Sequence, residues 1–306
     1  MRWRIAAFLL TGFACQLQAA STASLAKSES STEMDYDVAG KGPIGWSGGA
    51  LFAVEAQSSI LPVVRLFGRD GIQLAALAVN IPDARIVGVY SVARGSNGLV
   101  AIAGGAGDFE GRTTEFIALY PADGSVRKVI PIPVDIYHPN AIAVAADGSV
   151  WTAGIPQKNA SDHNVFWHFD SLGNKIGSAV SATMLPGSLA LTSALFAASP
   201  QGLVWVCPRD GRYLELSLDG DVTNDITVKF PSTTSIVTGL TVTEDGQRFV
   251  QVQSKQPRQI AIYSIDKKSG DLAVLANSPD FHLVGADGNN LVGVTSRRIV
   301  SVSIVP

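Results

Sequence analysis

The sequence predicts an all-β protein, a six-bladed β-propeller closed by an N-terminal strand and preceded by a signal peptide. Three observations support this fold. From residue 43 onward, short runs rich in β-branched and aromatic residues alternate with turns of Gly, Asp and Pro. Two kinds of turn each recur about 40 to 55 residues apart. No segment after residue 45 shows a sustained helical period, which excludes a doubly wound α/β sheet.

The N-terminus has the pattern of an export signal. Arg2 and Arg4 precede an apolar stretch over residues 5–17, and small residues follow at Ala19 and Ala20. The apolar stretch is shorter than the ~20 residues that a membrane span needs, so no transmembrane segment is expected. We therefore expect cleavage near Ala19 or Ala20 and a secreted or periplasmic protein.

The alternative of a lipoprotein attached through Cys15 is disfavoured. Gly12 stands three positions before it, where a lipobox has a branched apolar residue. Residues 21–42 are rich in Ser and poor in large apolar side chains, which predicts a flexible leader. A single propeller domain is then expected over residues 43–306.

Charge and cysteine content exclude several classes of partner and site. The formal net charge is −3, only 16% of residues are charged and basic runs are missing, so nucleic-acid binding has no electrostatic basis. Of the two cysteines, Cys15 belongs to the predicted signal, so Cys207 is alone in the mature chain. A disulfide framework and a Cys-rich metal site are excluded. The expected partner is a small molecule or a protein, and the chain is expected to be a monomer.

Two series of turns define the repeating unit. In the first, a polar turn with Gly precedes an alternating strand, as in "GSNGLVAIAGG" (95–105), "AADGSVWTAG" (145–154), "SPQGLVWVCP" (199–208), "TEDGQRFVQV" (243–252) and "GADGNNLVGV" (285–294). The second series follows each of these turns, as in "ALYPADGSV", "HFDSLGNKI", "ELSLDGDV" and "YSIDKKSGDL". Two interleaved hairpin turns per unit indicate four strands, which is one propeller blade. The units are 45–80, 83–131, 137–181, 186–229, 235–276 and 280–306, with seven blades as the alternative.

The last unit is about one strand short. We expect residues between Tyr36 and Ile44 to complete it, because a ring sealed by strands from both termini leaves no exposed sheet edge.

Trp151 follows the turn Asp147-Gly148, and Trp205 repeats it at the same offset from Gly202. The Asp-Gly pair suits a tight hairpin, which needs positive φ at the turn. Both tryptophans are predicted to pack between neighbouring blades.

The stretch "HPNAIAVAADGSVWTAG" (138–154) followed by "FWHFDSLGNKIG" (166–177) resembles NHL-type and streptogramin-lyase-like propeller repeats. The resemblance implies the propeller fold. Lyase activity in the relatives depends on a magnesium-assisted His and an acidic group, and no residues here match that group one by one. The unit count is also one fewer than in the seven-bladed lyases.

Three polar segments are candidates for a ligand site on the rim of the central channel. They are "GGAGDFEGR" (104–112), "VDIYHPN" (134–140) and "PQKNASDHN" (156–164), from adjoining units. Carboxylates together with imidazole suit a divalent cation such as calcium or magnesium, or acid–base work. The alternative is that these segments are solvated loop tips. The candidate ligand-binding residues are Asp108, Glu110, Arg112, Asp135, His138, Asp162 and His163.

Other motifs are weaker. "GWSGG" (45–49) has the nucleophile-elbow spacing around Ser47, but an elbow requires a strand-to-helix turn. "GAGDFEG" (105–111) would need a following helix to bind phosphate. His282 precedes an inner strand and is a secondary rim candidate.

The sequence thus favours an exported propeller that binds a ligand or serves as an interaction scaffold through its rim loops, without catalysis. The alternative is a divalent-metal-dependent lyase or lactonase on the same scaffold. The two differ in whether three or more carboxylate, amide or imidazole groups converge on the channel axis. Few acids occur in the expected inner strands, which favours binding.

Overall fold

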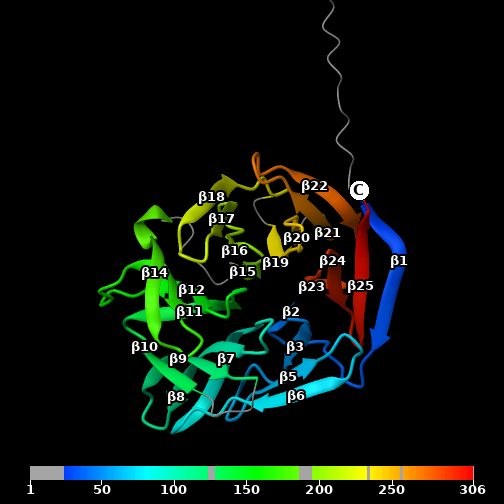
Figure 1. Ribbon diagram of the computed structural model, residues 1–306. Coiled ribbons are helices and arrows are strands. Elements are labelled where there is room, and N and C mark those ends of the chain that lie inside the picture. Colours follow the sequence, from blue (N-terminus) through cyan, green and yellow to red (C-terminus); the bar gives the residue numbers. More distant parts are fainter. Residues whose placement is uncertain (1–23, 123–127, 186–194, 233–234, 256–257, 306) are drawn as a thin grey trace, which may run out of the picture.

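The computed structural model describes residues 24–122, 128–185, 195–232, 235–255 and 258–305. These residues form six antiparallel sheets, set around a common centre in a propeller-like, all-β arrangement (Figure 1). In the described part of the chain, no helix has the length and apolar content needed to cross a bilayer. Residues 1–20, predicted as a signal peptide, lie outside the described residues.

The sheets are numbered here in chain order of their innermost strands, which we call the inner strands. Sheet 1 contains β2 (Ile44–Ser47), β3 (Ala50–Val54), β5 (Val63–Phe67) and β6 (Gln73–Ala78). Sheet 2 contains β7 (Ala84–Arg94), β8 (Val100–Asp108), β9 (Thr113–Tyr120) and β10 (Lys128–Pro133), with β4 (Ser58–Ser59) added beside β7. Sheet 3 contains β11 (Tyr137–Val144), β12 (Val150–Pro156), β13 (Asn164–Phe169) and β14 (Lys175–Ser181), and the short 3₁₀ helix η1 (Ala182–Met184) follows it.

Sheets 4 to 6 repeat this order. Sheet 4 contains β15 (Leu195–Ser199), β16 (Gly202–Val206), β17 (Arg212–Leu216) and β18 (Val222–Thr227). Sheet 5 contains β19 (Ile236–Val242), β20 (Arg248–Lys255), β21 (Arg258–Ile265) and β22 (Leu272–Asn277). Sheet 6 contains β23 (His282–Asp287), β24 (Asn290–Val294), β25 (Arg298–Val305) and β1 (Ser24–Glu33). Each predicted unit thus contains the main strands of one sheet.

The strand that completes sheet 6 differs from the one expected. It is β1, which pairs antiparallel with β25 along Ser30↔Ser301 and Glu33↔Arg298, so both ends of the chain meet in one sheet (Figure 1). Residues 24–33 were expected in the flexible leader, because their composition offers little to bury. An outermost strand needs only main-chain bonds to one neighbour, and Ser and Thr supply these as well as apolar residues do.

The segment expected to complete the sheet, between Tyr36 and Ile44, has another role. Val38 of this segment, and Met34 just before it, are buried beside Trp46 of sheet 1 and Val292 of sheet 6. The Val38 N–H also donates to the Ser296 carbonyl at 2.7 Å. This segment therefore fills the space between the first and last sheets.

The hairpin turns form as the Asp-Gly pairs predict. Gly148 has φ of +83°, its N–H donates to the Ala145 carbonyl at 3.0 Å, and the Asp147 carboxylate accepts the Ser149 N–H at 2.9 Å. A side chain at position 148 would be strained at this φ, which is why glycine follows the aspartate.

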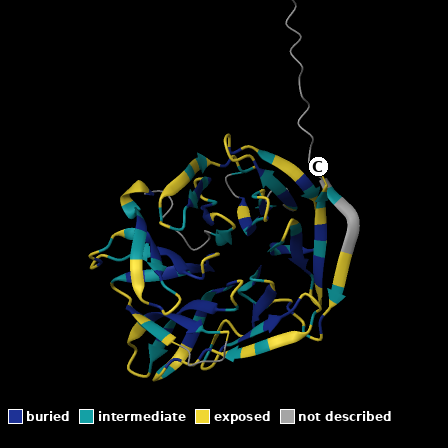
Figure 2. Ribbon diagram, viewed as in Figure 1, coloured by how far each residue is buried: buried dark blue, intermediate teal, exposed yellow. Residues whose placement is uncertain are grey.

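The core lies between neighbouring sheets. Trp151 of β12 and Trp205 of β16 are each 1% exposed and belong to one apolar cluster between sheets 3 and 4, which confirms their predicted packing role. Figure 2 shows buried residues concentrated in the middle strands, whereas outermost strands such as β6 carry many exposed residues. His168 stacks on Trp151 with ring centroids 3.9 Å apart, which gives it a structural role.

Candidate functional site

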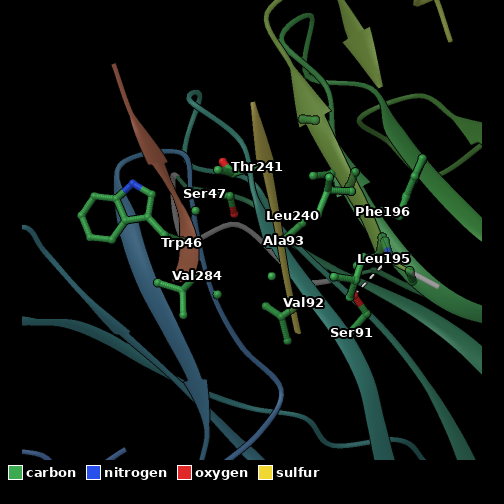
Figure 3. A pocket seen from close by; sticks show the side chains of 18 of the residues that line it. Trp46, Ser47, Ser91, Val92, Ala93, Leu195, Phe196, Leu240, Thr241 and Val284 are labelled. Carbon is green, nitrogen blue, oxygen red and sulfur yellow. Dashed lines mark hydrogen bonds between the residues drawn. The ribbon is translucent and has the colours of Figure 1, made fainter. Parts of the chain in front are cut away.

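The described residues line an open cavity of about 740 Å³ at the centre of the ring (Figure 3). Its walls come from all six inner strands, β2, β7, β11, β15, β19 and β23. Figure 3 shows Val92, Leu195 and Val284 around this space, although they belong to three different sheets. The cavity is therefore a product of the ring, and no single repeat unit contains it.

Four inner strands carry an irregularity where they border the cavity. The register of each against its neighbour shifts by one residue, and the extra residue lines the cavity in every case: Tyr90 in β7, Asn140 in β11, Thr238 in β19 and Val284 in β23. A bulge of this kind leaves one residue without a partner on the adjacent strand and re-aims it. These four residues therefore contribute side chains to the wall from positions that have no direct partner on the adjacent strand.

The wall is almost uncharged. Among the described residues that line the cavity, Arg94 carries the one full charge, and its guanidinium donates to the Gly48 carbonyl. The same described residues include no carboxylate and no imidazole, and Asn140 supplies the one side-chain amide. The convergence of three such groups that a catalytic or metal site would need is not found in this part of the chain.

Two serines of the wall bond main-chain groups of the next inner strand. Ser47 Oγ accepts the Arg94 N–H at 2.8 Å, and Ser91 Oγ accepts the Ile142 N–H at 3.1 Å. Ser47 ends β2 and is followed by β3, so the strand-to-helix turn of a nucleophile elbow is not formed here. Ser47 instead ties sheet 1 to sheet 2.

Near the cavity, His138 belongs to a half-buried polar cluster. Its Nδ1 lies 2.8 Å from Glu115 Oε1, with side-chain exposures of 33% for His138 and 10% for Glu115. The Tyr90 ring packs against the imidazole with centroids 5.1 Å apart. The hydrogen bond to Glu115 raises the pKa of His138, and burial together with the charge of Glu115 raises the pKa of Tyr90 to about 12.

Glu115 and Tyr90 are not among the residues predicted from the sequence. The glycines of β8 are the feature that could have indicated them, because a glycine leaves room for neighbouring side chains. A Cβ on Gly105 would lie 2.2 Å from Tyr90 Oη and 3.0 Å from Glu115 Oε2. Gly105 therefore leaves the room that these two side chains occupy. The run "GAGDFEG" continues into β9 and not into a helix, so these glycines serve strand packing and lack the helix N-terminus of a phosphate site.

Three of the predicted rim residues form one local turn between β8 and β9. Arg112 Nε lies 2.7 Å from Asp108 Oδ2, and Arg112 Nη2 lies 3.1 Å from Glu110 Oε2. The hydrogen bond from Arg112 lowers the pKa of Asp108. The Arg112 guanidinium therefore compensates part of the negative charge of the two carboxylates within the turn.

The other rim residues have separate partners. Asp135 Oδ2 accepts a bond from Asn159 Nδ2 at 3.1 Å, which joins two of the three predicted loops. Asp162 pairs with Lys175 at 2.6 Å; burial opposes ionisation, but the Lys175 bond prevails and lowers the pKa of Asp162. His163 is exposed in the same loop as Asp162.

The structure thus brings Asp108, Glu110 and Arg112 together but gives Asp135, His138 and Asp162 different neighbours. None of the seven predicted residues is among the described residues that line the cavity. Across the described ranges, no three His, Cys, Asp or Glu side chains are grouped as a metal ion would need.

His282, the secondary rim candidate, occupies a position in β23 like that of His138 in β11. Each precedes the bulge residue of its inner strand by two positions. His282 Nδ1 lies 2.8 Å from Gln251 Oε1, and burial lowers the pKa of His282. The Gln251 amide is itself buried and also donates to the Phe281 carbonyl at 3.1 Å.

Comparison with known proteins gives the fold and not a family. No family model matches the chain, and no curated protein matches it. A protein from Bacteroides fragilis named as exported has 12% sequence identity, covers 95% of this chain and 98% of its own, and superposes with a TM-score of 0.53.

Two enzymes are also among the similar structures. A gluconolactonase from Xanthomonas campestris has 12% identity, covers 90% of this chain and 98% of its own, and has a TM-score of 0.40. An oligogalacturonate lyase in complex with manganese has 12% identity, covers 84% of this chain and 74% of its own, and has a TM-score of 0.45. At these identities the likeness to the Bacteroides fragilis protein concerns the propeller-like fold alone.

Proposed function

We propose that this chain is an exported ligand-binding protein whose ligand occupies the central cavity, without catalysis there. The observation that carries the proposal is the cavity itself, which all six inner strands line. Its volume of about 740 Å³ lies within the usual range for small-molecule pockets. We also propose that each sheet is one blade, that β1 seals a six-bladed ring, that residues 1–20 are a signal peptide, and that the protein is a monomer.

The chemistry of the wall supports binding over catalysis. Acid–base catalysis needs a titratable group within reach of the substrate, usually a carboxylate or an imidazole. The described wall offers aliphatic side chains, small side chains and hydroxyl groups instead. The alternative, a divalent-metal-dependent lyase or lactonase, has no ligand set in the described ranges.

Binding through the rim loops has weaker support than binding in the cavity. Asp108 and Glu110 are already paired with Arg112, and Asp162 with Lys175. A ligand would have to displace these partners. The cavity wall requires no such exchange, since its one described charge already bonds a main-chain carbonyl.

The test uses N-phenyl-1-naphthylamine, an uncharged dye whose fluorescence rises in apolar surroundings. We expect the dye to bind the wild type, and Val284→Trp to weaken binding by about tenfold or more, because the larger ring fills the cavity. The matched control is Val274→Trp. Val274 is 48% exposed on β22, the outermost strand of sheet 5, whereas Val284 lies on β23, the inner strand of sheet 6. Thermal melting verifies that both variants fold. No binding by the wild type, or equal loss in both variants, contradicts the proposal.

A further inference from the structure

We infer that the cavity takes an extended, uncharged stretch of peptide, which pairs through its main chain with the inner strands. This inference rests on the proposed function, because it names the class of ligand for the same cavity. Its evidence lies in the main-chain edges that form the cavity wall and in one place where the chain already extends such an edge.

The wall is made of strand edges. In the described sheets, β2, β11, β15, β19 and β23 are each terminal, with a hydrogen-bonded neighbour on one side alone. A terminal strand presents a row of N–H and C=O groups along its second edge. Since residues of these five strands all line the cavity, the edges that lack a neighbouring strand border it.

The serine contacts show the direction of these edge groups. In an antiparallel pair, every second residue directs its N–H and C=O away from its neighbour. Arg94 and Ile142 are residues of this kind, because their N–H groups donate to serines of the preceding inner strand. Main-chain groups of this kind need partners when water is excluded. These two N–H groups have serine partners, so an occupant that displaces water from the remaining edge groups would have to offer donors and acceptors to those.

The chain itself extends one inner-strand edge. β4 pairs antiparallel with β7 through Ser58↔Gly88 and Ser59↔Val87, and the Val89 N–H donates to the Gln57 carbonyl at 2.8 Å. The next residue, Tyr90, is the first of β7 that lines the cavity. The edge of β7 thus accepts an antiparallel strand immediately outside the cavity. Addition of a peptide strand farther along an inner edge uses the same chemistry.

The wall also defines the side chains that such a peptide carries. A basic side chain would lose its hydration without gaining an opposite charge, which is costly, because the described wall includes no carboxylate. Each inner strand contributes between four and seven consecutive residues to the wall, from Leu283–Ala286 of β23 to Ile236–Val242 of β19. At ~3.3 Å per residue, this length accommodates about six residues of extended peptide.

The experiment measures binding of a fluorescein-labelled Ser-Val-Thr-Val-Ser-Val amide to the full chain by fluorescence anisotropy. The first comparator carries methyl groups on alternate peptide nitrogens, which removes the donors along one edge but keeps every side chain. The second comparator has lysine in place of both serines of this peptide. We expect the first peptide to bind, the methylated peptide to bind more than about tenfold more weakly, and the lysine peptide to weaken similarly. Val284→Trp should weaken the first peptide, whereas Val274→Trp should not.

The outcomes separate the two proposals. If the naphthylamine dye binds and the methylated peptide binds as well as its parent, the pairing is absent and the inference is wrong while the proposed function stands. The inference is also wrong if maltohexaose binds and the peptide does not, since the cavity then takes a carbohydrate. If the dye does not bind the wild type, the proposed function itself fails.

Discussion

The Nδ1 of His138 lies 2.8 Å from Glu115 Oε1, and this hydrogen bond joins the inner strand of sheet 3 to sheet 2. His282 holds the corresponding position in sheet 6 and bonds Gln251 of sheet 5 at the same distance. One histidine therefore faces a carboxylate and the other an amide. The hydrogen bond to Glu115 raises the pKa of His138, whereas burial lowers the pKa of His282.

The first prediction concerns pH. The raised pKa of His138 means that its pair with Glu115 stabilises the fold fully below the unfolded pKa of about 6.5 and less as pH rises through the folded pKa. Glu115→Gln should lower the free energy of unfolding by about 1 kcal/mol near pH 6, a figure that allows for the exposed third of the imidazole. The loss should shrink near pH 8.5. Tyr90 does not titrate in this range, since its pKa is about 12.

Urea unfolding measures this effect without adding salt. His282→Gln is the control, because burial lowers the pKa of His282 and its contribution should grow with rising pH. A loss in Glu115→Gln that is the same at both pH values would contradict the prediction.

The second prediction concerns Gly105. Gly105→Ala places a methyl group against Tyr90 Oη and Glu115 Oε2, and it should destabilise the fold by about 1–3 kcal/mol. Removal of the hydroxyl by Tyr90→Phe in the same chain should restore part of this loss. Gly177→Ala is the control, since the nearest atom to its added Cβ is 3.8 Å away. Melting temperatures of the wild type, the two single variants, the double variant and the control check the result, and additive losses without rescue would contradict it.

The third prediction concerns β1. A chain that begins at Met34 lacks β1, so the outer edge of β25 loses its partner and becomes free to pair with other molecules. We expect aggregation, visible by size-exclusion chromatography, and not merely a lower melting temperature. A soluble chain with an unchanged melting temperature would show that β1 contributes nothing to sheet 6.

The fourth prediction concerns metal ions. If binding needs no cation, calcium, magnesium and a chelator should each shift the melting temperature by less than about 1 °C, because a bound cation stabilises the native state by mass action. Dye binding should also be unchanged by the chelator. A shift of several degrees that Asp108→Ala abolishes would favour the metal-dependent alternative and the rim site.

Much of the fold could be predicted because it depends on near neighbours in the chain. The turn at Asp147-Gly148 needs only positive φ at the glycine and a short polar side chain before it. The alternation around Trp151 likewise places its indole on a buried face. The rim residues Asp108, Glu110 and Arg112 come together for the same reason, since one turn contains all three.

The strand beside β25 could not be predicted from composition. Residues 24–33 are mostly polar, and their place depends on main-chain pairing with a strand at the other end of the chain. A pattern of side chains does not report such bonds, because any extended segment of suitable length can form them.

By itself, the sequence determined the repeating hairpin units and the packing of Trp151 and Trp205, since local periodicity and turn chemistry control both. Only the tertiary structure decided that His138 meets Glu115, that Gly105 makes room for Tyr90, and that six inner strands line a cavity. The first and third of these relationships join residues from different sheets, whereas Gly105 and Tyr90 lie on paired strands of sheet 2. All three depend on how the ring curves and where the inner strands bulge.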